Sequence, residues 1–81
     1  MDSTADLKMT PRYIAVSEAA HRIAEELGHS YVGVEHLFVA IIRDGSAIPS
    51  QLIERHVRRD TLEQEILNLM TSAGYQGQRP D

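Results

Sequence analysis

Glu35 is the residue whose type and position could do the most specific chemistry in this sequence. It follows Gly33 and Val34 at the expected first turn of an otherwise apolar helix. A carboxylate at that position is favoured by the positive end of the helix dipole. It could also pair with an incoming guanidinium group in a bidentate geometry. The spacing leaves both interpretations open, a structural charge at a helix start or a recognition site for a cationic group.

Residue types that support catalysis or metal binding do not form a set in this chain. The four histidines, at positions 21, 29, 36 and 56, include no pair four residues apart with an adjacent glutamate, the arrangement of helical zinc sites. Glu35 and His36 are neighbours, so their side chains on a helix point about 100° apart. The sequence has no Cys, no glycine-rich phosphate loop and no Gly-x-Ser-x-Gly turn. We therefore expect no enzymatic activity, no metal and no cofactor.

The only basic cluster covers residues 55–59, Arg-His-Val-Arg-Arg. It falls at an expected helix end, where cations complement the helix dipole. Helix–turn–helix binding of DNA is the alternative interpretation. Eight Lys and Arg against twelve Asp and Glu give a net charge of -4, so nucleic acid is not an expected partner. No apolar run approaches the roughly 18 residues of a membrane span. Residues 1–6 are polar, unlike a signal peptide, and a soluble cytoplasmic protein is predicted.

Two amphipathic helices are predicted in the first half of the chain. Thr10 and Pro11 suit the N-cap and first position of a helix, and Gly28 suits its left-handed end. The apolar positions between them recur in steps of three and four: Tyr13, Val16, Ala20, Ile23, Ala24 and Leu27. After a loop at 29–33, the second helix has the same periodicity at Val34, Leu37, Phe38, Ile41 and Ile42. Val39 and Ala40 widen its apolar arc, so we expect this helix to be central and to end at Arg43-Asp44-Gly45.

Two further helices are predicted in the second half. The third covers 46–57, with Ser46 as N-cap and Pro49 in the first turn. Its expected inward residues are Ile48, Leu52, Ile53 and His56 or Val57. The fourth begins at Asp60, which forms a capping box with Glu63. Its apolar positions are Leu62, Ile66, Leu69, Met70 and Ala73, and Gly74 ends it.

The sequence thus predicts an all-α fold, a compact array of four to five short helices. We expect a flexible leader over residues 1–9, one domain over 10–73 and a disordered tail over 74–81. A folded part of about 60 residues buries only about 60% of its unfolded surface. Without disulfides or a metal, a domain of that size often depends on a partner or a second copy.

The segment from Leu27 to Leu37, Leu-Gly-His-Ser-Tyr-Val-Gly-Val-Glu-His-Leu, resembles the signature of the Clp N-terminal repeat. This repeat belongs to the substrate-receiving domain of Clp-type AAA+ unfoldases, and the resemblance is to the ClpC branch. Residues 9–12, Met-Thr-Pro-Arg, are similar to the aromatic-Thr-x-Arg opening of each repeat. The resemblance covers roughly residues 10–70. Two repeats usually pack as a pseudo-twofold pair, whereas this chain has one repeat and no Walker A sequence. It resembles half of a domain, whose bare apolar surface a symmetric homodimer would cover.

The resemblance also implies a binding site. In the ClpC-type domain a matching Glu contacts the guanidinium of phosphoarginine, and residues near the Thr-x-Arg opening lie close to the phosphate. Carried over, Glu35 is the guanidinium acceptor, and Thr10 and Arg12 are candidates for the phosphate. Val34 stands where the family usually has Thr, and Met9 replaces the aromatic residue.

Several functions are compatible with this resemblance. The leading one is a non-enzymatic protein-binding module that recognises degrons, adaptors or phosphoarginine-marked clients, as a stand-alone decoy or adaptor. The alternative is a regulatory partner that docks on the N-domain of a Clp unfoldase. A small DNA-binding regulator is the third.

Overall fold

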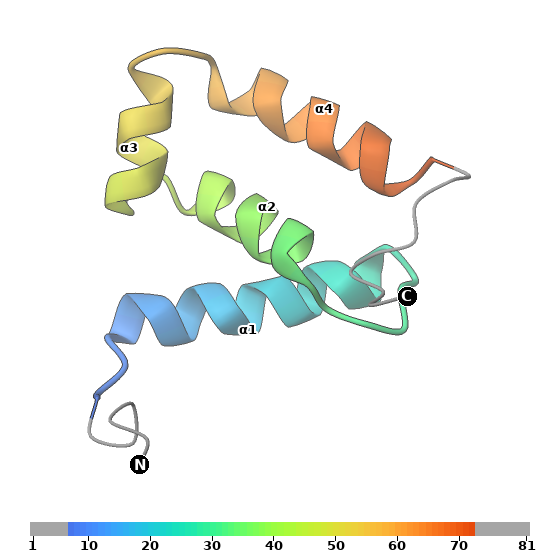
Figure 1. Cartoon of the computed structure of the whole chain (residues 1–81), viewed down its shortest axis with the longest axis horizontal. Helices are drawn as coiled ribbons and strands as arrows, with labels where there is room; N and C mark the ends of the chain where they lie inside the picture. Colours follow the sequence, from blue (N-terminus) through green and yellow to red (C-terminus); the bar gives the residue numbers. More distant parts are fainter. Residues whose placement is uncertain (1–6, 73–81) are drawn as a thin grey trace.

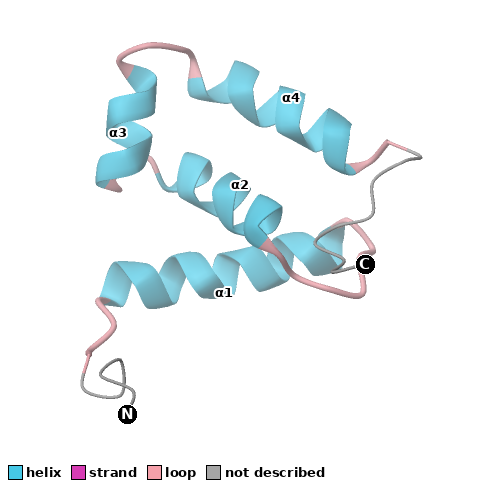
Figure 2. Ribbon diagram, viewed as in Figure 1, coloured by secondary structure: helices cyan, strands magenta, loops and turns pink. Residues whose placement is uncertain are grey.

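The computed structural model describes residues 7–72 and confirms the all-α prediction. It has the helices α1 (Pro11–Glu26), α2 (Val34–Asp44), α3 (Ile48–Glu54) and α4 (Arg59–Met70). Figures 1 and 2 show α2 between α1 and α4, with α3 beside the end of α2. Within residues 7–72 there is no strand. The predicted leader and tail lie largely outside these residues, as do Ala73 and Gly74.

α1 begins and ends as the sequence predicts. The Thr10 hydroxyl accepts a hydrogen bond from the Tyr13 backbone N–H at 3.1 Å, and Pro11 occupies the first turn. Gly28 follows the helix with φ +75°, the left-handed conformation that favours glycine. Four of the predicted apolar positions are buried: Val16, Ala20, Ile23 and Ala24. Tyr13 belongs to the same periodicity but is 53% exposed, because it lies in the first turn, beyond this buried stretch of α1.

α2 is the central helix, as predicted, and contacts each of the other three helices. Its buried residues are His36, Val39, Ala40 and Ile42. Val34 is 59% exposed, so the first residue of the predicted apolar stripe is not part of the core. Gly45 ends α2 with φ +59°, and a Cβ there would lie 3.2 Å from two nitrogens of the Arg59 guanidinium. This position therefore favours glycine for its conformation, and a larger residue would also have to displace the Arg59 guanidinium slightly.

The prediction for α3 was wrong at both ends and for most of its inward face. The helix is capped by Ala47 rather than Ser46, and it ends at Glu54 rather than Val57. Ser50 is completely buried, and its hydroxyl donates to the Ala47 carbonyl at 2.8 Å. Of the predicted inward residues, Ile53 is half-buried. Ile48, Leu52 and Val57 are instead 78%, 52% and 49% exposed, and His56 is exposed. The only buried side chain of the short helix is thus the small Ser50, which permits close approach, whereas Ile48 and Leu52 face outward.

The predicted capping box at the start of α4 was also wrong. α4 begins at Arg59 after Arg58, and Asp60 lies inside its first turn, where it accepts from the Thr61 N–H at 2.8 Å. Glu63 does not reach back to the helix start, because it pairs with Arg43 of α2 at 2.8 Å. Towards the other end, Leu69 is 70% exposed. Met70 of the same helix belongs to the core, and Ile66 and Leu67 pack against it.

The core lies where α1, α2 and α4 meet. Its main cluster consists of Val16, Ala20, Ile23, Val39, Ala40 and Met70. Two of these six residues are alanines, so the cluster buries little apolar surface for the number of positions it uses. A core of this kind fits the expectation that the domain gains stability from a partner.

Candidate binding site

The four residues of the predicted site lie at two separate places. Val34 and Glu35 are in the first turn of α2. Thr10 and Arg12 are at the start of α1, and Arg12 contacts Asp44, the last residue of α2. α1 and α2 run antiparallel (Figure 1), so the start of one lies beside the end of the other. Since α2 has 11 residues, the two places are separated by roughly 15 Å of helix. Within one chain, the structure does not bring the two pairs together.

Both members of the pair on α1 already have hydrogen bonds. Thr10 uses its hydroxyl as the N-cap of α1. Arg12 donates from Nη1 to both carboxylate oxygens of Asp44, at 2.8 and 2.9 Å. The Arg12 side chain is still 50% exposed, so an anion can approach it without opening the core. An anion bound there would compete with Asp44 for the guanidinium.

The pair on α2 lies in a different environment. Glu35 is half-buried and is the acidic residue of the first helical turn, where the helix dipole stabilises its charge. Its charge also acts on the neighbouring His36, where it opposes the lowering of the imidazole pKa by burial and by His29. Val34, on the same turn, offers an exposed apolar side chain. The turn therefore presents a carboxylate beside apolar surface, which suits the head and the aliphatic stem of an arginine side chain.

A cluster that sequence reasoning missed supports this turn. His36 is completely buried, and its Nδ1 accepts a hydrogen bond from the Gly33 N–H at 2.9 Å. The Nε2 of the same ring lies 2.8 Å from Nδ1 of His29. Tyr31 stacks on His29 with ring centroids 5.1 Å apart. The signal was present in the sequence, because residue 36 has the third-position spacing from Gly33 at which a capping box places an acceptor.

The pKa of His36 is lowered from its ordinary value. Burial is the main cause, since the charged imidazolium loses its hydration, and the nearby His29 adds to the effect. Glu35 and the hydrogen bond from Gly33 act in the opposite direction. The net result is a neutral, acceptor-bearing ring at the start of α2 at neutral pH.

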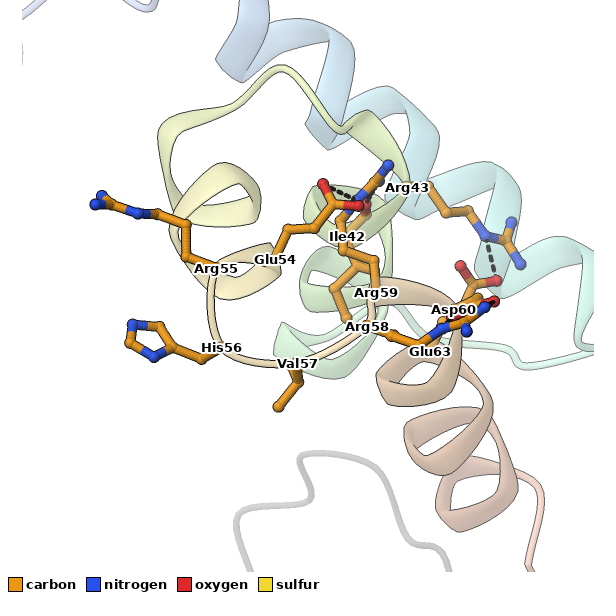
Figure 3. A pocket seen from close by; sticks show the side chains of 10 residues that line it. All are labelled: Ile42, Arg43, Glu54, Arg55, His56, Val57, Arg58, Arg59, Asp60 and Glu63. Atoms are coloured by element: carbon orange, nitrogen blue, oxygen red, sulfur yellow. Dashed lines mark hydrogen bonds and ion pairs between the residues drawn. The ribbon is translucent and has the colours of Figure 1, made fainter.

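A second feature is an open groove of about 890 Å³ between the end of α2 and the turn from α3 to α4. Figure 3 shows the residues that line it: Ile42, Arg43, Glu54, Arg55, His56, Val57, Arg58, Arg59, Asp60 and Glu63. Three of its four arginines form ion pairs, namely Arg43 with Glu63, Arg58 with Asp60 and Arg59 with Glu54. Arg55 and His56 point away from the others. With four arginines and three carboxylates, the groove is not strongly basic.

Arg59 gives the basic cluster a structural role that differs from the expected one. Its Nη1 donates a short hydrogen bond to the Ile42 carbonyl, and its Nε donates to Glu54 at 3.1 Å. The residue thus caps the end of α2, although it is itself the first residue of a different helix, α4. The sequence placed a cation near a helix end, but the identity of that helix depends on tertiary structure.

A smaller groove of about 300 Å³ lies between α1 and α2, at the end where Arg12 meets Asp44. Its floor is formed by Ala15, Val16, Ala19 and Ala40. Within residues 7–72 there is no group of three or more His, Cys, Asp or Glu that could hold a metal ion. None of the helices in the described part of the chain is long and apolar enough to cross a membrane.

Comparison with known proteins identifies the family. Residues 1–56 match the Clp repeat (R) N-terminal domain. The chaperone protein ClpB of Oceanobacillus iheyensis is 35% identical over 79 residues, which are 91% of this chain and 10% of that protein. The negative regulator of genetic competence ClpC/MecB of Bacillus subtilis is 36% identical over 64 residues, 78% of this chain and 8% of that protein. The chain thus spans about a tenth or less of the length of these relatives. No solved structure matches. The matched family and the level of identity show that this chain belongs to the Clp repeat N-terminal domain family.

Proposed function

We propose that this chain is a non-enzymatic protein-binding module of the Clp proteolysis system, which acts in the cytoplasm on clients or adaptors of a Clp unfoldase. The observation that carries the proposal is the first turn of α2, where half-buried Glu35 lies beside exposed Val34. The ligand chemistry that fits this turn is a guanidinium group with an aliphatic stem, as in an arginine or phosphoarginine side chain.

Phosphoarginine sets a geometric requirement. Its phosphate is bonded directly to a guanidinium nitrogen, so the groups that bind the cation and the anion have to converge on one place. Glu35 and the pair of Thr10 and Arg12 are at opposite ends of α2 in one chain. We propose that a symmetric homodimer supplies the convergence, with the α1 start of one copy facing the α2 start of the other. The small core supports a second copy on independent grounds.

Titration of the chain with free phosphoarginine, followed by NMR, tests the ligand. We expect the largest amide shifts at residues 33–37, and a loss of affinity on the order of 10-fold or more in Glu35→Gln, because a charge-assisted pair is removed. Glu25→Gln is the matched control, since Glu25 is an exposed carboxylate on α1. A parallel titration with unmodified arginine shows how much of the affinity comes from the phosphate group. Equal affinity of Glu35→Gln and the parent chain would place the site elsewhere.

Sedimentation tests the dimer separately. We expect self-association at tens of micromolar, together with loss of phosphoarginine binding on dilution to the monomer. A monomer that binds phosphoarginine undiminished would rule out the composite site but leave Glu35 as the guanidinium acceptor.

A second function, docking on the N-domain of a Clp unfoldase, is favoured by the outward face of α3. Ile48 and Leu52 are four residues apart and both exposed, so they form a short apolar strip. Co-elution with an isolated unfoldase N-domain tests this function. Retained binding by the double variant Ile48→Ser, Leu52→Ser would contradict a role for α3.

A further inference from the structure

The start of α2 is held by a continuous chain of hydrogen bonds through two histidines. The Gly33 N–H donates to Nδ1 of His36 at 2.9 Å, and Nε2 of His36 lies 2.8 Å from Nδ1 of His29. His36 is completely buried, so this chain lies out of solvent at its centre. It connects the first turn of α2 to the loop that precedes it.

The chain fixes where each proton lies. A backbone N–H can only donate, so Nδ1 of His36 carries a lone pair and its proton is on Nε2. That Nε2–H then donates to His29, whose Nδ1 also carries a lone pair. Both rings are therefore neutral, and each nitrogen within the chain has one defined role. The neutral pair carries two ring protons, one on each imidazole. A further proton, added at Nδ1 of either ring, would turn an acceptor into a donor and break at least one of the two hydrogen bonds.

The loop depends on the same rings. Tyr31 stacks on His29 with an interplanar angle of 11°, and it meets the edge of His36 at a centroid distance of 5.7 Å. Rotation of either imidazole to relieve a donor–donor contact would disturb this three-ring arrangement. Loss of the hydrogen bonds is therefore expected to disrupt the ring contacts as well.

The charged or titratable side chains that face the His36 imidazole within residues 7–72 include His29 and Tyr31 from the loop and Glu35 from α2 itself. The carboxylate of Glu35 favours a proton on His36, whereas burial and His29 oppose it. The ring is neutral at neutral pH and has a carboxylate at hand to stabilise the protonated form once the pH falls.

We propose that the His29–His36 pair is a proton-operated latch, which holds the 28–33 loop against the start of α2 when the pair is neutral and releases both when it gains a proton. Release frees the Gly33 N–H, loosens the first helical turn and changes the position of Glu35 and Val34 on that turn. The latch is a property of the chain alone and does not require that Glu35 binds phosphoarginine.

NMR of the parent chain tests the latch without a ligand. At about pH 7.5, above the ordinary histidine pKa, ¹⁵N spectra should show His36 neutral with its proton on Nε2. Lowering the pH until the ¹⁵N spectra show a proton on both ring nitrogens of His36 should reduce the hydrogen-exchange protection of the Gly33 amide on the order of 10-fold, after correction for intrinsic exchange, as expected for loss of one hydrogen bond. Protection in the middle of α1, at Ala20, should change far less. A proton on Nδ1 of His36, or Gly33 protection that is independent of pH, would overturn the proposal.

A variant identifies the responsible group. His36→Gln places an amide oxygen at the capping-box position, where it can accept from Gly33 but does not titrate. We expect this variant to keep Gly33 protected at both pH values. His56→Gln removes an exposed histidine from the turn between α3 and α4, and it should retain the pH response of the parent chain. If His36→Gln does not fold, the tautomer and exchange measurements on the parent chain still decide. An unchanged pH response in a folded His36→Gln variant would refute the latch.

Discussion

The two ends of α2 are held by opposite means. At its start, a buried neutral imidazole accepts from Gly33 and connects to His29. At its end, two guanidinium groups form the stabilising contacts: Arg59 donates to the Ile42 carbonyl, and Arg12 pairs with Asp44. Both ends satisfy backbone groups that a helix leaves unpaired. We therefore expect the stability of the first end to depend on pH and the stability of the second end to depend on salt concentration.

Between these ends, loss of apolar packing in α2 should lower the free energy of unfolding more than any other change considered below. Ile42 is 1% exposed, so Ile42→Ala should lower the free energy of unfolding by about 2–5 kcal/mol, through lost burial and the cavity left behind. Urea unfolding followed by circular dichroism measures it. The control is Ile48→Ala on α3, where the side chain is 78% exposed and the expected change is within about 0.5 kcal/mol. Equal losses in the two variants would mean that a second copy covers α3.

Removal of the guanidinium cap at the end of α2 should have the next largest effect. Arg59→Ala deletes the donor to the Ile42 carbonyl and the ion pair with Glu54, and it leaves a gap beside Gly45. We expect a loss of about 1–2 kcal/mol, because the Arg59 side chain is 29% exposed and water replaces part of the lost interaction. Arg55→Ala, in the same basic cluster but without an ion pair among the described residues, should be nearly neutral. A neutral Arg59→Ala would show that water caps α2 equally well.

Acidification should weaken the start of α2 by a smaller amount. The pKa of His36 is lowered in the folded chain relative to 6.5, so the unfolded state binds more protons where the two values differ. The contribution of His36 to stability is therefore complete above the unfolded value and is lost as the pH falls through the lower folded value. We expect a loss on the order of 1 kcal/mol, the worth of one hydrogen bond. Urea unfolding across that range measures it, and His36→Gln should show a flatter profile. A parent chain that becomes more stable on acidification would contradict the assignment.

The same comparison explains how far the sequence could be interpreted. The start and end of α1 and the end of α2 were predictable, because Thr10, Pro11, Gly28 and Gly45 act through local backbone geometry. The inward face of α3 was not, because helical periodicity shows which residues share a face but not whether a neighbour covers it. In this chain that face has no covering helix within residues 7–72, and Ser50 is buried in place of Ile48.

For the candidate site, the sequence identified the residues but not their separation. Glu35 stood out by its type and position and Arg12 only through the family resemblance, whereas the antiparallel arrangement that separates them is tertiary. The roles of Arg59 and Glu63 were hidden for the same reason, since their partners on α2 are at least 17 residues away in the chain.

The smallest expected effect belongs to the exposed ion pair at the end of α2. Arg12→Gln removes a guanidinium that is 50% exposed, so the free energy of unfolding should fall by no more than about 0.5–1 kcal/mol at low ionic strength. In 1 M NaCl, where the screening length is about 3 Å, the difference should shrink towards zero. Arg22→Gln, at another exposed position on α1, serves as the control and should change stability less than Arg12→Gln. The measurement matters for binding, because an Arg12 that contributes little to stability can exchange Asp44 for a phosphate at small cost. A loss above about 2 kcal/mol that persists in high salt would instead make Arg12 part of the scaffold and remove it from the proposed site.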